Sequence, residues 1–359
     1  MGVRNIDGAS TGDMTNNVTD YSIDSLSTDG STGSGETTFQ GEYSKWNGYY
    51  KTISVLKSII DRKAMWTVGK GFETDEKTKK ILDRIRGFGK DTFNSIMFNA
   101  VVTYTVGGDF FAEIIRDKAG RLTNLKPLNP ESIRIVVNDN GIIKRYEQTD
   151  RNKKVVATFK VDEIFHLAKD RTADEIHGTS TIEKLESTIL SYEEAKNDLK
   201  KVFHRYVKPI HVFKLDTDDP SEIATFKAKA DAAVENGENM FIPKDAVEME
   251  RVSIPQFSTL DPIPWIQELE KLMIMSEGVP AIVLGSGTGN SEATGKILYL
   301  AFQQMVEWNQ LFLEEQLKAQ LGVEVEFEFP ASIEPELMQD TKKDKGQVTE
   351  MNVDPTKKS

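Results

Sequence analysis

Cysteine is absent from the 359 residues of this chain. Its absence excludes disulfide scaffolds, zinc–cysteine sites, iron–sulfur clusters and thiol catalysis. The chain also lacks a run of 18 apolar residues, so nothing in it predicts a membrane-spanning helix. Its first residues lack the apolar segment of a secretory signal, and Ile6 stands where a myristoylation signal requires Ser or Thr. These absences predict a soluble protein of the intracellular type, with no membrane partner.

Basic residues are in deficit. The 45 Lys and Arg residues face 57 Asp and Glu residues, which gives a net charge of −12 at pH 7. A chain of this charge repels a polyanion on average, so tight binding to DNA phosphates over its whole surface is disfavoured, while local contacts stay open. The length allows two or three compact domains with cores of their own, so folding requires neither a metal nor a disulfide.

Apolar residues are scarce at both ends of the chain. Residues 1–40 are rich in Gly, Ser, Thr, Asp and Asn, and their one basic residue, Arg4, faces six acidic residues. Such a segment buries too little apolar surface to offset the entropy of ordering it, so we predict a disordered tail over residues 1–40. The polar, charged composition of residues 331–359 predicts a flexible tail there as well.

Between these tails, hydrophobic periodicity predicts both helices and strands. Apolar residues at helical spacing predict helices over 43–61, 76–86 and 92–106, with a short strand at 65–69 after the first. From Asp109 the period changes to two. The alternating segments are separated by short turn sequences, and together they predict a β-meander of roughly 60 residues. They are DFFAEIIRD, ESIRIVVND, IIKRYEQT, KVVATF and DEIFHLA.

The helix that follows carries a narrow apolar seam. Ser180 and Glu183 have the spacing of a capping box, which predicts that the helix begins there, and Pro209 predicts its end. A seven-residue repeat of this width is typical of packing against one neighbouring helix. The apolar members of the seam are Ile182, Leu185, Ile189, Tyr192, Leu199 and Phe203. The change from acidic to basic residues along this helix favours complementarity to the helix dipole, and an electrostatic role along a channel is the alternative.

The remaining part predicts a small α/β unit and two further helices, so the fold class is α+β. Asp219 followed by Pro220 is typical of a helix start. The predicted elements are a strand at 211–215, a helix from Pro220 to 236, a strand from 240, helices over 262–278 and 295–321, and a strand over 323–329. On the helix over 262–278, Ile266, Leu269 and Met273 share one face.

A Gly-rich loop at residues 285–296 has the general form of a phosphate-binding loop. In a P-loop, however, Ser or Thr follows Gly-Lys, and here Ile297 follows Lys296. The glycine required five residues before Gly295 is replaced by Asn290. An exposed flexible loop is therefore the preferred interpretation, and a nucleotide site is an alternative.

The four histidines do not predict a metal site. His166 and His177 are eleven residues apart, whereas a helical metal pair requires a spacing of three or four. We predict instead a hydrogen-bonding histidine at the end of a strand. No nucleophile elbow or carboxylate pair stands out, so we predict a protein that is not an enzyme and has no cofactor and no metal.

Four stretches in order make residues 43–329 resemble the portal proteins of tailed bacteriophages. These are KWNGYYKTISVLKSIIDRKAMW, GGDFFAEIIRDKAGRLTNLKPLNPESIRIV, DEIFHLAKDRTADEIHGTSTIEKLESTI and SEGVPAIVLGSGTGNSEATGKILYLAFQQMVEWNQLFLEEQL. No single motif is specific, but four in order over about 290 residues form a strong composite signal. The chain ends soon after its last predicted strand, so the resemblance implies a short or absent C-terminal crown.

The resemblance implies a ring of identical subunits, usually twelve, at one capsid vertex, which serves in genome packaging, head–tail joining and DNA ejection. It also implies a division of the chain into a wing (41–178), a first stem helix (179–208), a clip (209–256), a second stem helix (257–280), a channel loop (281–294), and a long wing helix with a strand (295–330). The apolar seam would then face the neighbouring subunit.

In this interpretation, DNA slides past the channel loop. The polar residues of that loop are Ser286, Thr288, Asn290 and Ser291. They carry no charge that would hold phosphates in place. The implied partners are other copies of the chain, a packaging terminase motor, head–tail adaptors, a major capsid or scaffolding protein, and transiently double-stranded DNA. The implied location is the virion, with the host cytoplasm during assembly. The alternatives are a nucleotide-binding enzyme that uses residues 285–296 and a different structural subunit of the virion.

Overall fold

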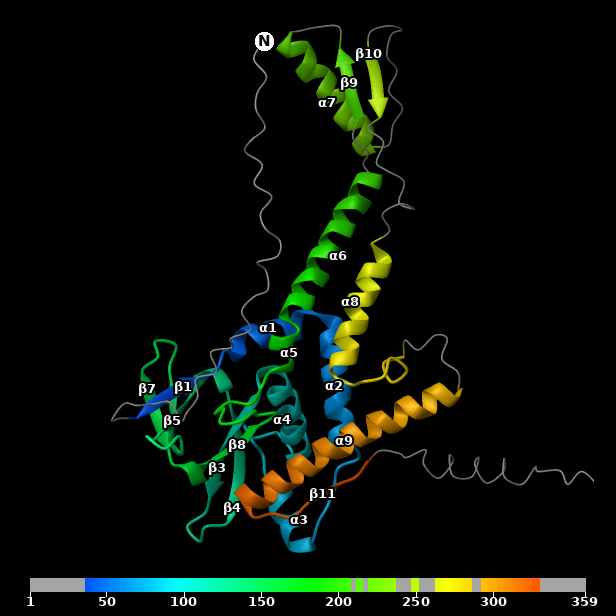
Figure 1. Cartoon of the computed structure of the whole chain (residues 1–359). Coiled ribbons are helices and arrows are strands. Elements are labelled where there is room, and N and C mark those ends of the chain that lie inside the picture. The colour runs from blue at the N-terminus through cyan, green and yellow to red at the C-terminus, as the bar shows by residue number, and fades with distance from the viewer. Residues whose placement is uncertain are drawn as a thin grey trace, which may run out of the picture.

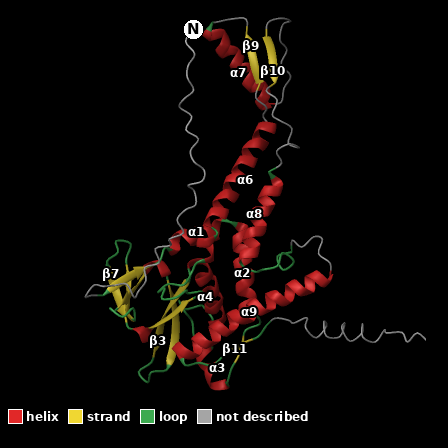
Figure 2. Cartoon of the chain, in the orientation of Figure 1, coloured by secondary structure: helices red, strands yellow, loops and turns green. Residues whose placement is uncertain are grey.

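The computed structural model describes residues 36–207, 211–215, 219–236, 247–251, 262–285 and 292–329. It has mixed helices and sheets, as the α+β class predicts, and a pair of helices projects from a broad body (Figure 1). Figure 2 shows the larger sheets on one side of this body and the long helices on the other. Most of both predicted tails lies outside the described residues.

The helices of the body pack around one central, almost fully buried helix, α4. They are α1 (Tyr43–Thr52), α2 (Ser54–Val68), α3 (Glu76–Leu82), α4 (Phe93–Gly107) and α9 (Glu292–Leu321). The hydroxyl of Thr92 caps α4 by accepting a hydrogen bond from the Ser95 backbone N–H at 3.2 Å. Helix α3 ends four residues before the predicted boundary, and α9 begins three residues before it.

The strand predicted at 65–69 is wrong. These residues complete α2, because Thr67 and Val68 are buried in the packing of α2 against α4 and α9. The helix ends at Gly69, whose φ of 60° is a left-handed conformation that glycine adopts without strain. Tertiary packing therefore overrides the β-propensity of this short apolar run.

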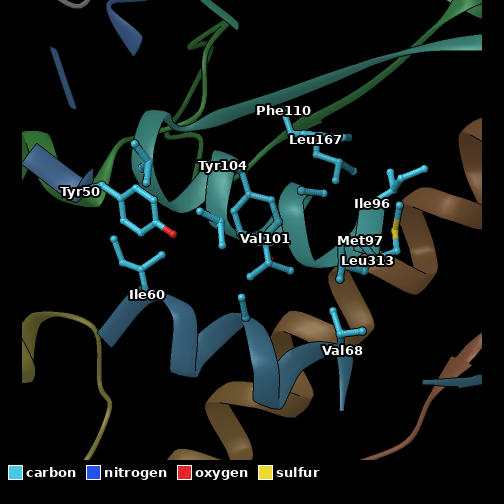
Figure 3. Close-up of a cluster of buried hydrophobic side chains, with 14 of the residues drawn as sticks. Tyr50, Ile60, Val68, Ile96, Met97, Val101, Tyr104, Phe110, Leu167 and Leu313 are labelled. Carbon is cyan, nitrogen blue, oxygen red and sulfur yellow. The ribbon is translucent and has the colours of Figure 1, made fainter. Parts of the chain in front are cut away.

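Side chains of α4 form the centre of the hydrophobic core (Figure 3). Met97, Val101 and Tyr104 are fully buried between α2 and the sheet that carries Phe110 and Leu167. Burial of a large apolar side chain contributes about 1.5–3 kcal/mol, so this layer holds the helices and the sheet together.

The body contains two larger antiparallel sheets. Their strands are β1 (Thr37–Gln40), β3 (Asp109–Arg116), β4 (Leu122–Leu128), β5 (Ile133–Val137), β6 (Ile143–Thr149), β7 (Val155–Phe159) and β8 (Ile164–Ala168). One sheet has the order β1-β5-β6-β7 and the other β4-β3-β8. The predicted meander is therefore correct for β5, β6 and β7, and it is wrong at its ends. It omits β4, and β8 returns to β3 because Phe165 and Leu167 join the helical core.

Residues 37–40 correct the predicted boundary of the N-terminal tail. They form β1, which pairs with β5. Two ion pairs hold the start of this strand, since Glu36 lies 2.7 Å from Lys144 and 2.5 Å from Arg145. Local composition did not indicate this strand, because its partners lie about 100 residues away in the sequence.

The projecting part begins with α5 (Thr181–Lys184) and α6 (Glu186–Val207), which are separated at Leu185, and returns through α8 (Ile263–Ser276). Beyond the end of α6 lie β9 (His211–Leu215), α7 (Pro220–Asn236) and β10 (Val247–Arg251) (Figure 1). Strands β9 and β10 form an antiparallel pair. The strand predicted from residue 240 begins outside the described residues.

A short ribbon closes the body next to α9. It pairs β2 (Phe72–Glu73) with β11 (Glu326–Phe327). Residues 323–327 alternate between buried and exposed, as their sequence predicts, although only two of them are paired as a strand.

Candidate functional site

The candidate functional site is the projecting pair α6–α8 and the place where it joins the body. The two helices pack side by side (Figure 1). Tyr192 of α6 donates a hydrogen bond to Glu270 of α8, with 2.8 Å between the two oxygens. Leu269 and Met273 are buried and Ile266 is partly buried, so the predicted inner face of α8 is confirmed.

The predicted seam divides into a buried and an exposed part. Its first four members, Ile182, Leu185, Ile189 and Tyr192, are buried in the core of the same chain. Their burial therefore requires no second subunit. Leu199 is partly buried and Phe203 is 53% exposed, so these two seam residues keep surface that the chain itself does not cover.

A second apolar stripe lies on the outer face of α8, and the sequence analysis missed it. Trp265 is 55% exposed, Leu272 43% and Met275 65%. Their spacing of seven and three residues places them on one side of the helix. A helix that packs on one partner normally has a polar outer face. The apolar residues on a second face of α8 were therefore the sequence signal that could have predicted this stripe. Exposed apolar stripes of this kind mark surfaces that bind another protein.

A buried carboxylate joins the projecting helices to the body. Asp109, at the start of β3, lies 3.0 Å from Nε2 of His166 on β8 and 2.5 Å from Nδ1 of His177. Its Oδ1 also accepts a hydrogen bond from the backbone N–H of Gly178 at 3.0 Å. His177 and Gly178 belong to the loop that leads into α5. The predicted hydrogen-bonding histidine is confirmed in His166, but it lies in the middle of β8 and not at the end of the strand. The sequence analysis missed Asp109 as its partner.

The Asp109 carboxylate stays ionised in this environment. Burial raises the pKa of Asp109. The hydrogen bonds from His166 and His177 and the charges of these residues lower it by more, so that the pKa falls to about 2. The second ring nitrogen of His166 lies 3.1 Å from the Tyr146 hydroxyl, and its ring stacks on Phe111. The cluster is therefore a structural clamp, in which the carboxylate oxygens are already occupied by donors. Among the described residues, no group of three or more His, Asp or Glu is placed to hold a metal ion.

Two glycines allow the loop to approach β3 closely. A Cβ atom on Gly108 would collide with the carbonyl of Gly178, and a Cβ atom on Gly178 would collide with the carbonyl of Gly108. Ser180 follows directly and makes two hydrogen bonds. Its hydroxyl donates to the Val106 carbonyl at 2.5 Å and accepts from the Glu183 N–H at 3.1 Å. The Ser180 half of the predicted capping box is confirmed, and the same hydroxyl also ties α5 to α4.

The Ser180→Ala variant is expected to lower the free energy of unfolding by about 1–2 kcal/mol, because the helix cap and a buried hydrogen bond are lost together. Urea denaturation of the full chain measures this loss. The matched control is Thr225→Ala, whose hydroxyl donates to Ser221 on the exposed surface of α7. We expect the control to change stability by less than about 0.5 kcal/mol. Equal effects of the two variants would contradict the anchoring role of Ser180.

Buried charges form a second connection at the base of α8. Lys63 of α2 lies 2.7 Å from Glu277, which follows the last residue of α8, and both side chains are buried. Nearby, Lys169 donates a hydrogen bond to Asn309 of α9. Burial, reinforced by the neighbouring charge of Lys63, lowers the pKa of Lys169 to about 8. The Lys63–Glu277 pair fixes the base of α8 on α2, because breaking a buried ion pair is costly. The Lys169–Asn309 hydrogen bond holds the end of β8 on α9.

The predicted channel-loop residues lie outside the described residues. Ser286, Thr288, Asn290 and Ser291 all fall between Gly285 and the start of α9. The structure therefore describes only the two ends that the loop connects.

A family model described as phage portal protein matches residues 87–306 of the chain. This chain belongs to the phage portal protein family, which confirms the resemblance inferred from its four motifs. Portal proteins are structural proteins, so the family gives the chain a structural role as a portal. A comparison with curated proteins finds no match.

Solved structures share the fold at low sequence identity. A chain of the virion of a native gene transfer agent particle is 13% identical with a TM-score of 0.65, and the match covers 90% of this chain and 94% of that one. A chain from the neck of the native particle, computed with C12 symmetry, is 13% identical with a TM-score of 0.65, covering 87% and 92%. An HK97 family phage portal protein from Corynebacterium diphtheriae is 14% identical with a TM-score of 0.52, covering 82% and 96%.

Proposed function

We propose that this chain assembles into a ring of identical subunits that forms the DNA channel at one vertex of a virion. The ring would serve in genome packaging, head–tail joining and DNA ejection. Helices α6 and α8 would form the stem of each subunit, the unit of β9, α7 and β10 the clip, and residues 281–294 the channel loop. The body would form the wing. The C12 symmetry of the similar neck structure supports a ring of twelve.

The observation that carries this proposal is the apolar outer face of α8. Trp265, Leu272 and Met275 are 43–65% exposed. They lie on α8, one of the two helices that project from the body (Figure 1). In a monomer, the contact of these apolar side chains with water is unfavourable. A head-to-tail contact with a second copy would bury the stripe, and such contacts close into a ring when the rotation between copies is a whole fraction of a turn.

The charge of the chain fits transient contact with DNA. The net charge is −12 at pH 7, and about five of these charges lie before residue 41. The remaining negative charge, repeated around a ring, would repel DNA and so let it slide rather than bind it. The packaging motor and the head–tail adaptors would dock on the clip, and a major capsid or scaffolding protein would surround the wing. The chain would act in the virion and, during assembly, in the host cytoplasm.

Electron microscopy of the purified full chain tests this function, combined with light scattering for the mass. We expect rings with a central opening wide enough for a DNA duplex and a mass close to twelve subunits. Compact monomers or dimers at every protein concentration would contradict the proposal. If such monomers also bound ATP or NAD and lost this binding in a Lys296→Ala variant, the nucleotide-binding alternative would replace it.

A further inference from the structure

Phe88 forms an exposed apolar tip next to α3. Its side chain is 72% exposed, which is more than any other large apolar side chain among the described residues. It lies in the sequence RIRGFGK, between Gly87 and Gly89. An exposed phenylalanine costs free energy in water unless a partner covers it.

The backbone around Phe88 is held firmly. Asn124 accepts hydrogen bonds from the N–H groups of Arg86 at 3.0 Å and Gly87 at 2.8 Å, and its amide donates to the Gly87 carbonyl at 2.9 Å. The Asp91 carboxylate accepts from the Phe88 N–H at 2.9 Å. A loop fixed in this way loses little entropy when it binds, which favours a binding role for its aromatic tip.

Basic residues flank this tip in the sequence and outnumber the neighbouring acidic residues Asp83 and Asp91. Arg84 and Lys90 are exposed on either side of it, and α3 adds exposed Lys77, Lys79 and Lys80. We call residues 84–90 the Phe88 knob. Its chemistry is that of an aromatic plug with a cationic rim, so it fits a receptor with an apolar floor and acidic walls.

The same chain carries such a receptor between α9 and the ribbon of β2 and β11. This groove has a volume of about 660 Å³, and Leu311, which is 44% exposed, contributes apolar surface to it. We call it the acidic groove, because most of its lining side chains are carboxylates. These are Glu73, Asp75, Glu314, Glu315, Glu324 and Glu326. Trp308, one helical turn before Leu311 on α9, adds a further exposed apolar surface.

The carboxylates of the acidic groove oppose one another. Glu326 pairs directly across the ribbon from Glu73, and a hydrogen bond that protonated Glu73 donates to the neighbouring Glu328 raises the pKa of Glu73. Like charges opposite each other in a ribbon are destabilising. Lys318 is the one cation among the residues that line the groove, and it is paired with Glu324 at 2.8 Å. A cationic partner would relieve this repulsion.

We propose that the Phe88 knob of one subunit inserts into the acidic groove of the next subunit. A ring contact of this kind needs two different and complementary patches on one chain, and the knob and the groove meet that need. Phe88 would cover Leu311 and Trp308, while Arg84 and Lys90 would face the carboxylates of the groove. The proposal rests on the ring of the proposed function and adds a second contact, in the wing, to that of the stem.

Because the chain has no cysteine, single cysteines report this contact without interference. The experiment assembles a mixture of two variants, one with Phe88→Cys and one with Leu311→Cys. The mixture is then treated with a short bis-maleimide. We expect covalent dimers on a denaturing gel from the mixture. We expect none from either variant assembled alone, since in the proposed contact Phe88 of one subunit meets Leu311 of the next and not a second Phe88. Val156→Cys, 61% exposed on β7, replaces Phe88→Cys in the matched control mixture.

A charge-reversal series gives an independent readout. The double variant Arg84→Glu, Lys90→Glu should raise the subunit concentration at half-assembly about tenfold or more, with an unchanged melting temperature. Adding Glu315→Lys and Glu326→Lys to the same chain should restore assembly.

The outcomes separate this contact from the ring itself. Rings without the cross-link, with no effect of charge reversal, would overturn the contact and leave the ring intact. Absence of rings in the unaltered chain would overturn the proposed function and this contact with it. If a DNA duplex protected the new thiol of the Phe88→Cys variant from maleimide, and no cross-link formed, the knob would instead be assigned to DNA.

Discussion

The Asp109→Ala variant is expected to lower the free energy of unfolding by about 3–5 kcal/mol, because removing one partner from a buried charged cluster leaves the others unsatisfied. The two imidazoles of His166 and His177 would lose their common acceptor, and the Gly178 N–H would lose its own. The loop before α5 would then no longer be held on β3. Urea denaturation followed by circular dichroism measures the loss.

A surface carboxylate provides the matched control for this variant. Asp117 lies 2.8 Å from Arg121 in an exposed hairpin, and exposed pairs contribute less than about 1 kcal/mol. We therefore expect Asp117→Ala to be several times less destabilising than Asp109→Ala. If both variants unfolded at the same urea concentration, the clamp would have no special role in stability.

The pH dependence of stability follows from the same carboxylate. The pKa of Asp109 is lowered from 3.8 to about 2 in the folded chain. A lowered pKa means that the unfolded chain binds the proton more readily, so the contribution of Asp109 is fully present above about pH 4 and is lost as the pH falls to about 2. This contribution of Asp109 to the free energy of unfolding is about 2–3 kcal/mol. The difference in stability between the original chain and Asp109→Ala should shrink over this interval, and a constant difference would contradict the assignment.

Ring assembly is expected to fail when the exposed apolar residues of the projecting helices become charged. Trp265→Asp and Phe203→Asp should each abolish rings, because burying an unpaired carboxylate at a subunit contact costs several kcal/mol and the cost recurs at every contact. Both positions are more than half exposed in the single chain, so the monomer should stay folded. Light scattering and electron microscopy report assembly, and thermal melting reports folding.

Two further variants separate assembly from folding. Ile189→Asp places a charge at a fully buried position of α6 and should unfold the chain itself. Val156→Asp, 61% exposed on β7, should leave both folding and rings unchanged. Intact rings in Trp265→Asp and Phe203→Asp would show that these residues lie outside the subunit contacts.

Much of the local structure could be predicted from short-range patterns. The cap at Ser180, the start of α7 at Pro220 and the inner face of α8 all depend on residues within a few positions of one another. The alternation of residues 323–327 is local as well. Such signals stand in the sequence itself, because helix and strand periods repeat over three or four residues at most.

The candidate site was only partly predictable. The seam on α6 could be found from its seven-residue repeat, but its division into a buried half and an exposed half depends on where α8 and the body cover it. The sequence around Asp109 gives little indication of its role, since it is a single acidic residue at the start of an apolar strand. Its two histidine partners lie 57 and 68 residues further along the chain.

The sequence by itself determined the α+β class, the periods of most helices, the cap at Ser180, the start of α7 at Pro220, and membership of the phage portal protein family. Tertiary structure alone decided that residues 65–68 are helical, that residues 37–40 join a sheet, and that β8 pairs with β3. It also placed Asp109 between two histidines. The physical reason is the range of the interactions. Caps and periodicity act between near neighbours, whereas strand pairing, core burial and buried hydrogen bonds join distant segments whose meeting depends on the whole fold.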